Sequence, residues 1–222
     1  MKKIFVFGDS FSASFKPKED ELIENFRHHY IKWLGYTPKC YGEFMSEKLN
    51  IELVNKSVGG YCNSDIFESI CSISDIIKNG DIIIIGWTKI ERFRLARIDD
   101  DTWWINFNSF FNEGDYDAGK SILIGKQTMN EILVNRTNSQ YKTELFNWIK
   151  LINITFKNNK IFHWSWDTDI NQNDIISKPV KNIKQIRDVT NYEVNDRHWE
   201  EGSHKTFALY IIENLNLNLK LI

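Results

Sequence analysis

The alternation of apolar and polar positions predicts strands separated by helices. Four short apolar runs, at residues 4–7, 51–54, 82–85 and 161–164, predict strands because each is bounded by Gly, Asn, Asp or Lys. The four isoleucines at 82–85 show no alternation, which is typical of a strand buried on both faces of a parallel sheet. Helical spacing of apolar residues predicts helices over 41–49, 65–77 and 144–156, and a last helix from about Glu201. The pattern therefore predicts an α/β sandwich with a mostly parallel sheet.

The length of the chain favours a single domain. It has 222 residues, of which 42% are hydrophobic, enough for one compact core. Two aromatic-rich regions, at 17–38 and 99–119, fit the strand and helix repeat poorly and are expected to be insertions over one rim of the sheet. We therefore expect one domain over residues 1–222 that carries both insertions.

Charge and cysteine content exclude several function classes. The formal net charge is −2, from 28 Lys and Arg against 30 Asp and Glu, and without a long basic run nucleic acid binding is not expected. No stretch approaches the roughly 20 apolar residues of a membrane span, and the run at 4–7 is too short for a signal peptide, so we expect a cytoplasmic protein. Cys40, Cys62 and Cys71 form no Cys-x-x-Cys pair, so neither a disulfide framework nor a metal site is expected.

The loops that follow the strands hold the candidate chemistry, because ligands of such sheets bind at the carboxyl ends of the strands. Gly8-Asp9-Ser10 follows the first run and would place the Ser10 hydroxyl at this edge, near backbone N–H groups. A serine hydroxyl becomes a strong nucleophile only when a base takes its proton. Taken alone, Gly-Asp-Ser is also a common turn or helix-cap sequence.

Candidate bases lie near the other end of the chain. Asp196 and His198 are two residues apart just before the last predicted helix, so the carboxylate could orient the imidazole toward a serine. His204, with Glu201 as its carboxylate partner, is the rival base. It ranks second because residues 201–208 already have a helical pattern, which would carry His204 away along the helix.

Three of these segments resemble the conserved blocks of the SGNH/GDSL serine hydrolases. The blocks are Phe7-Gly8-Asp9-Ser10-Phe11-Ser12, Val54-Asn55-Lys56-Ser57-Val58-Gly59-Gly60 and Asp196-Arg197-His198-Trp199, in the order that the family has. The resemblance implies a flavodoxin-like three-layer α/β/α sandwich with roughly five strands. It also implies a serine esterase without a cofactor, in which Ser10 is the nucleophile, Asp196 and His198 complete the triad, and the N–H groups of Ser10 and Gly60 bind the oxyanion.

The chain departs from the family at the third block. Where the family has Gly-x-Asn-Asp, with an Asn that donates to the oxyanion, this chain has Gly86-Trp87-Thr88-Lys89. The Thr88 hydroxyl can donate one hydrogen bond from that position. Asn63 is the alternative donor to the oxyanion hole.

The substrate is expected to be a small-molecule or carbohydrate ester. Trp87 and Arg92 follow the third strand, and an aromatic face beside a charged group suits a sugar ring. Three alternatives stay open. The same triad could transfer the acyl group to an alcohol, as an O-acyltransferase does. The chain could be a non-catalytic flavodoxin-like protein that cradles a phosphate at residues 8–14, or a degenerate SGNH protein that binds a glycan or a partner without turnover.

Overall fold

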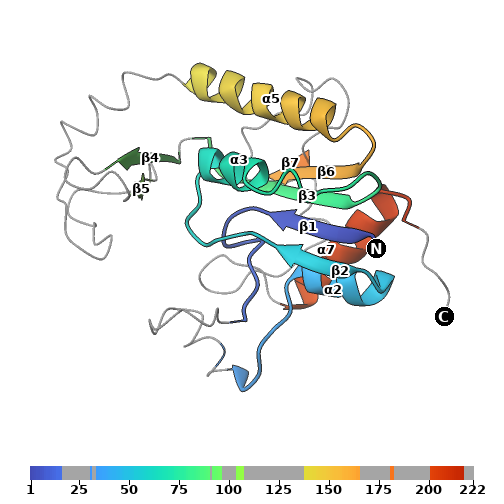
Figure 1. The fold of residues 1–222 in the computed structure, drawn as a ribbon. Coiled ribbons are helices and arrows are strands. Elements are labelled where there is room, and N and C mark those ends of the chain that lie inside the picture. The colour runs from blue at the N-terminus through green and yellow to red at the C-terminus, as the bar shows by residue number, and fades with distance from the viewer. Residues whose placement is uncertain are drawn as a thin grey trace.

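A central parallel sheet organises the computed structural model (Figure 1). The structure describes residues 1–16, 31, 34–90, 92–96, 104–107, 138–165, 181–182 and 201–217. The strands of the sheet are β1 (Lys3–Phe7), β2 (Glu52–Asn55), β3 (Ile82–Trp87), β6 (Lys160–Ser165) and β7 (Lys181–Asn182). Every neighbouring pair in the order β2-β1-β3-β6-β7 is parallel. The other four strands make up most of the sheet, because β7 has only two residues.

The strand order confirms the predicted fold class. Counted in chain order, the strands of this sheet lie in the order 2-1-3-4-5, which is the flavodoxin-like arrangement. In that arrangement the chain reverses direction across the sheet beside the first strand, and the loops that follow β1 and β3 meet at the carboxyl edge. The order therefore places the loop that contains Ser10 at this point.

The sheet separates two apolar cores because side chains alternate along each strand. Ile4 and Val6 of β1 face one core, together with Ile82 and Ile84 of β3. The intervening residues of both strands, Phe5, Phe7, Ile83 and Ile85, face the other core. All eight side chains are buried, so the apolar runs without alternation reflect strands covered on both faces, as predicted from the sequence.

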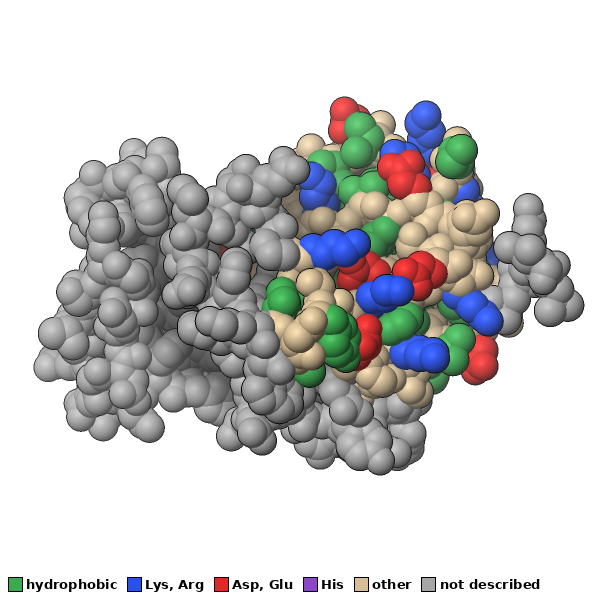
Figure 2. Space-filling model, turned by 90° about the horizontal axis from the view of Figure 1, so that it is seen from below, with side chains coloured by type: hydrophobic (Ala, Val, Ile, Leu, Met, Phe, Trp, Pro, Cys, Tyr) green, Lys and Arg blue, Asp and Glu red, His purple; other side chains and the backbone are tan. Residues whose placement is uncertain are grey.

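Two pairs of helices cover the two faces (Figure 1). Helices α2 (Tyr41–Leu49) and α7 (Glu201–Asn214) pack on one face, while α3 (Asn63–Cys71) and α5 (Asn138–Thr155) pack on the other. Helix α2 has the bounds that the sequence predicts, and α7 begins at the predicted residue. On the described part of the α2 and α7 side, acidic and basic side chains are intermingled (Figure 2).

Helix α3 ends six residues earlier than the apolar spacing predicts. The hydroxyl of Ser72 donates to the Ser69 carbonyl (2.9 Å) and that of Ser74 to the Cys71 carbonyl (2.9 Å). Serine side chains that bond nearby carbonyls in this way compete with the helical ladder. The chain continues in turns that keep Ile73 and Ile77 against the core, so the apolar spacing persists where the helix does not.

A separate hairpin, β4 (Phe93–Ala96) and β5 (Trp104–Phe107), follows the third strand of the sheet. Strand β5 is the described part of the expected insertion at 99–119, and within the described residues it pairs with β4 in an antiparallel two-stranded sheet. Of the expected insertion at 17–38, residues 31 and 34–38 are described. Within these ranges, no helix combines the length and apolar composition needed to cross a bilayer.

Candidate active site

Ser10 lies in one helical turn that begins directly after β1. The Asp9 carbonyl accepts hydrogen bonds from the N–H groups of Ser12 (3.0 Å) and Ala13 (3.1 Å), which closes the turn around Ser10. The Asp9 carboxylate is buried, and its Oδ1 accepts the Phe11 N–H (3.1 Å). Asp9 therefore fixes the turn through both its backbone and its side chain, while Ser10 is partly exposed.

The buried Ser12 holds this turn in place. A methyl group on Gly8 would lie 2.8 Å from Ser12 Cβ and 3.0 Å from the Gly86 carbonyl oxygen, so only glycine allows this approach of β1 to Ser12 and β3. The buried Ser12 hydroxyl accepts a hydrogen bond from Tyr41 (2.8 Å), and the Ser12 carbonyl accepts one from Asn55 Nδ2 (2.9 Å). Side chains from α2 and β2 thus hold the segment that follows Ser10.

The loop after β2 runs beside the Ser10 turn. The N–H of Lys56 donates to the Val6 carbonyl (2.8 Å), and that of Val58 donates to the Gly8 carbonyl (3.1 Å). Gly60 has a φ of +88°, in the region that favours glycine, and a methyl group there would meet no atom within 4 Å. This loop therefore brings Gly60 toward the carboxyl end of β1 in a conformation that is set by the backbone and not by crowding.

The loop after β3 is tied to the start of α3 by Asn63. Its Oδ1 accepts the Thr88 N–H (2.9 Å), and its Nδ2 donates to the carbonyls of Thr88 (3.1 Å) and Lys89 (3.3 Å). The Asn63 side chain thus already binds the backbone at 88–89. In contrast, the Thr88 hydroxyl is completely buried and has no hydrogen-bond partner in the described part of the chain.

Arg92 joins the first two loops to the third. Its Nη1 lies 3.3 Å from Asp9 Oδ2 and 3.1 Å from the Tyr61 carbonyl oxygen. The Arg92 side chain is 14% exposed and that of Asp9 is 2% exposed, so the ion pair is largely shielded from water. The predicted role of Arg92 was substrate contact, whereas the observed contacts are with the loops themselves. The sequence gives no signal for this pairing, because the partners are 83 positions apart.

Trp87 lies in the core and not in a loop that faces a ligand. Strand β3 extends through Gly86 and Trp87, which pair with Trp164 and Ser165 of β6. The Trp87 side chain is completely buried, and its indole N–H donates to His163 Nδ1 (3.1 Å). This position differs from the predicted substrate contact because the strand continues two residues beyond the isoleucine run.

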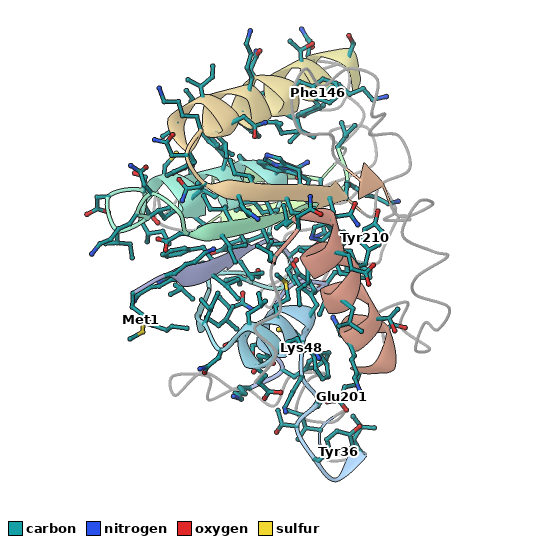
Figure 3. All side chains as sticks on the ribbon, turned by 90° about the vertical axis from the view of Figure 1, so that its right-hand side faces the viewer. Met1, Tyr36, Lys48, Phe146, Glu201 and Tyr210 are labelled. Atoms are coloured by element: carbon teal, nitrogen blue, oxygen red, sulfur yellow. The ribbon has the colours of Figure 1, made fainter. Side chains whose placement is uncertain are left out.

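The start of α7 is held by the segment before α2. Glu201 accepts hydrogen bonds from the Tyr36 hydroxyl (2.9 Å) and the Lys39 N–H (3.0 Å), and Figure 3 shows Tyr36 and Glu201 together at this end of the molecule. His204 is buried and stacks on Tyr41, with ring centroids 6.1 Å apart. Glu201 and His204 thus contact different groups. Asp196 and His198 lie outside the described residues.

Among the described residues at this edge of the sheet, metal-ligating side chains do not cluster. Within the ranges that the structure describes, no group of three or more His, Cys, Asp or Glu side chains could hold a metal ion. Besides the ion pair of Asp9 and Arg92, the described loops at this edge supply a serine hydroxyl, a threonine hydroxyl and backbone N–H groups. Such groups suit nucleophilic attack and the binding of an oxyanion.

Comparison with known proteins finds likenesses among solved structures. No protein-family model and no curated protein sequence matches the chain. The chain is similar to a member of the lipolytic protein G-D-S-L family from Veillonella parvula, with 12% identity, a TM-score of 0.43 and 100% of both chains covered. It is also similar to a candidate GDSL-like lipase from Parabacteroides merdae, with 14% identity, a TM-score of 0.37 and 97% of this chain and 76% of that chain covered.

Proposed function

We propose that this protein is a serine esterase of the SGNH/GDSL kind, with Ser10 as its nucleophile. The observation that carries the proposal is that the loops following β1, β2 and β3 are hydrogen-bonded to one another around the Ser10 turn. A nucleophile needs such support, because its hydroxyl must stay in line with the carbonyl that it attacks. The alternative of a phosphate-binding turn is disfavoured, because the buried carboxylate of Asp9 would lie directly beside the bound anion.

The proposed reaction is acyl transfer to water. Ser10 Oγ attacks the carbonyl carbon of the ester while His198 takes its proton, and Asp196 orients and stabilises the imidazolium. The tetrahedral intermediate collapses as the C–O bond to the alcohol breaks, and His198 returns the proton to the leaving alkoxide. Water, deprotonated by His198, then releases the acid from Ser10. The reaction requires no metal or organic cofactor.

The proposed oxyanion hole combines two backbone N–H groups and one hydroxyl. Ser10 lies at the start of a helical turn, where N–H groups point away from the turn and favour negative charge. Gly60 lies in the loop after β2, whose Lys56 N–H donates to the Val6 carbonyl of β1. We assign the third donor to Thr88, whose buried hydroxyl has no partner in the described part of the chain, and give Asn63 the role of holding the Thr88 backbone in place.

Labelling with a fluorophosphonate probe tests the nucleophile. We expect the wild-type protein to gain one adduct on the peptide that contains Ser10, and Ser10→Ala and His198→Ala to gain none. Ser14→Ala is the matched control, because Ser14 lies in the same segment but bonds Glu43 (3.3 Å). If the wild-type protein hydrolyses short-chain p-nitrophenyl esters and Ser10→Ala retains that activity, the proposal is wrong.

Substitution of Thr88 tests the third donor. Thr88→Val keeps the shape of the side chain but removes the hydroxyl, so we expect kcat to fall on the order of 100-fold, as for the loss of one oxyanion donor. Thr88→Ser, the control, keeps the hydroxyl and most of the activity. Equal rates for Thr88→Val and the wild type would assign the hole to the two backbone groups.

A further inference from the structure

We infer that Arg92 is a positioning residue that sets the spacing between the Ser10 turn and the Gly60 loop. The inference rests on the proposed function, since it concerns the two loops that supply the backbone N–H groups of the proposed hole. It also gives Arg92 a role different from the substrate contact that the sequence predicts.

The contacts of Arg92 lie on both sides of the proposed hole. Asp9 directly precedes Ser10, and Tyr61 directly follows Gly60. Arg92 Nη1 contacts both, at 3.3 Å from Asp9 Oδ2 and 3.1 Å from the Tyr61 carbonyl oxygen. A single nitrogen therefore bridges the two loops at positions adjacent to the two N–H groups that must converge on one oxyanion.

The Asp9 carboxylate transmits this constraint to Ser10. Its Oδ1 accepts the Phe11 N–H (3.1 Å), so one oxygen holds the turn while the other meets the guanidinium. Rotation of the carboxylate would disturb both contacts at once. The ion pair thus fixes the orientation of the turn, in addition to balancing the charge of Asp9.

Arg92 is itself held to the third loop. Its backbone N–H donates to the Lys89 carbonyl (3.1 Å), and the same carbonyl accepts Asn63 Nδ2 (3.3 Å). The guanidinium therefore reaches the first two loops from a turn that α3 fastens to the end of β3. The contacts of Arg92 therefore connect all three loops to one another.

Because the ion pair of Arg92 and Asp9 is shielded from water, its loss is expected to disturb the Ser10 turn. Exposed pairs contribute little, whereas removal of one partner from a shielded pair leaves an uncompensated charge, here the Asp9 carboxylate. Loss of the guanidinium should let Asp9 turn toward water and move the Ser10 turn with it. Lysine keeps the charge, but its compact ammonium on a flexible stem does not reproduce the planar guanidinium.

Steady-state kinetics of Arg92→Ala and Arg92→Lys test the inference. We expect kcat to fall about 10- to 100-fold in Arg92→Ala, the size of effect that a displacement of about 1 Å produces, while KM changes less than about threefold. Arg92→Lys should lie between Arg92→Ala and the wild type. Added guanidinium ion should restore part of the kcat of Arg92→Ala. Lys3→Gln is the control, because it removes an exposed ion pair with Glu52 at the opposite edge of the sheet and should leave both constants unchanged.

Two results would overturn the inference. A rise in KM with unchanged kcat would make Arg92 a substrate contact, and unchanged constants would make the bridge irrelevant. If Arg92→Ala does not fold, Arg92→Lys and Asp9→Asn decide, since we expect both to lower kcat without raising KM. Failure of the wild-type protein to label at Ser10 would instead refute the proposed function, and the positioning role with it.

Discussion

The two faces of the sheet each bury a tryptophan whose indole N–H has a polar partner, but the two arrangements end differently. On the α2 and α7 face, Trp164 donates to the Tyr41 hydroxyl (3.3 Å), which donates to Ser12 (2.8 Å) in the Ser10 turn. On the α3 and α5 face, Trp87 donates to His163 (3.1 Å), whose Nε2 lies 3.4 Å from Asn153 Oδ1 on α5. One network therefore ends at the candidate active site and the other ends at a helix.

Burial of a polar network therefore does not by itself mark a functional site. Both networks satisfy polar atoms that would otherwise be costly in the core. Only the network on the α2 and α7 face contacts a segment whose position the proposed chemistry depends on. Substitutions on this face should change activity, whereas matched substitutions on the other face should change stability alone.

The largest effect is expected from Gly86→Ala. The added methyl group would lie 2.6 Å from Ser12 Oγ and 2.7 Å from Trp164 Cζ2, so it would push apart the two ends of the Tyr41 network. We expect a loss of unfolding free energy of about 1–3 kcal/mol from overpacking, together with near-complete loss of ester hydrolysis. Chemical denaturation and steady-state kinetics measure the two effects.

Ile83→Val is the control on the same strand, since Ile83 faces the α3 and α5 core. It should cost about 0.5–1.5 kcal/mol and leave the kinetics unchanged. Wild-type kinetics in Gly86→Ala would show that the close contact with Ser12 is not needed.

A smaller effect on activity is expected from a matched pair, Tyr41→Phe and His163→Phe. Each removes the acceptor of a buried indole N–H, so each should lower the unfolding free energy by about 1–3 kcal/mol. Only Tyr41→Phe should also lower kcat, because it releases Ser12. Equal kcat values for the two variants would contradict the distinction between the faces.

The alkaline stability of the protein should also depend on Tyr41. Burial raises the pKa of its hydroxyl well above the ordinary value of about 10 that the unfolded chain retains. Its stabilising contribution is therefore constant below about pH 9 and is lost as the pH rises past 10, because the unfolded state ionises first. Between about pH 9 and 11, the Tm of the wild-type protein should fall more steeply than that of Tyr41→Phe.

The smallest effect concerns a feature that the two faces share. Cys40 precedes α2 and Cys62 precedes α3, and their N–H groups donate to Glu43 (2.9 Å) and Asp65 (2.9 Å) respectively. Burial raises the pKa of Cys40 to about 12 and that of Cys62 to about 11, so both thiols stay protonated near neutral pH. A thiol reagent should therefore modify only the exposed Cys71 in the native protein, and mass spectrometry of the modified peptides checks this.

Much of the fold could be predicted because it depends on local patterns. The isoleucine run and the helical spacing of apolar residues locate β3 and α2 without knowledge of their partners. The predicted end of α3 is wrong, because apolar periodicity gives no information on the hydrogen bonds of Ser72 and Ser74.

The candidate site could be predicted less completely because its contacts are between distant parts of the chain. The motifs predict roles for Ser10 and Gly60, but they do not show that Arg92 bridges Asp9 and Tyr61. The sequence predicts Trp87 at the site because this residue follows the apolar run, whereas pairing with β6 keeps it in the core. The roles of Ser10, Gly60, Asp196 and His198 stay predictions that labelling can test.

The order of strands in the sheet also bears on how the chain folds. β1 lies between β2 and β3, so both of its edges must wait for partner strands that come later in the chain. The turn after β1 is then held by Asn55 and Arg92, which come from progressively later parts of the chain. Contacts of such wide sequence separation form slowly. Return of activity during refolding should therefore report assembly of the sheet as far as β3 and not the formation of its first strand.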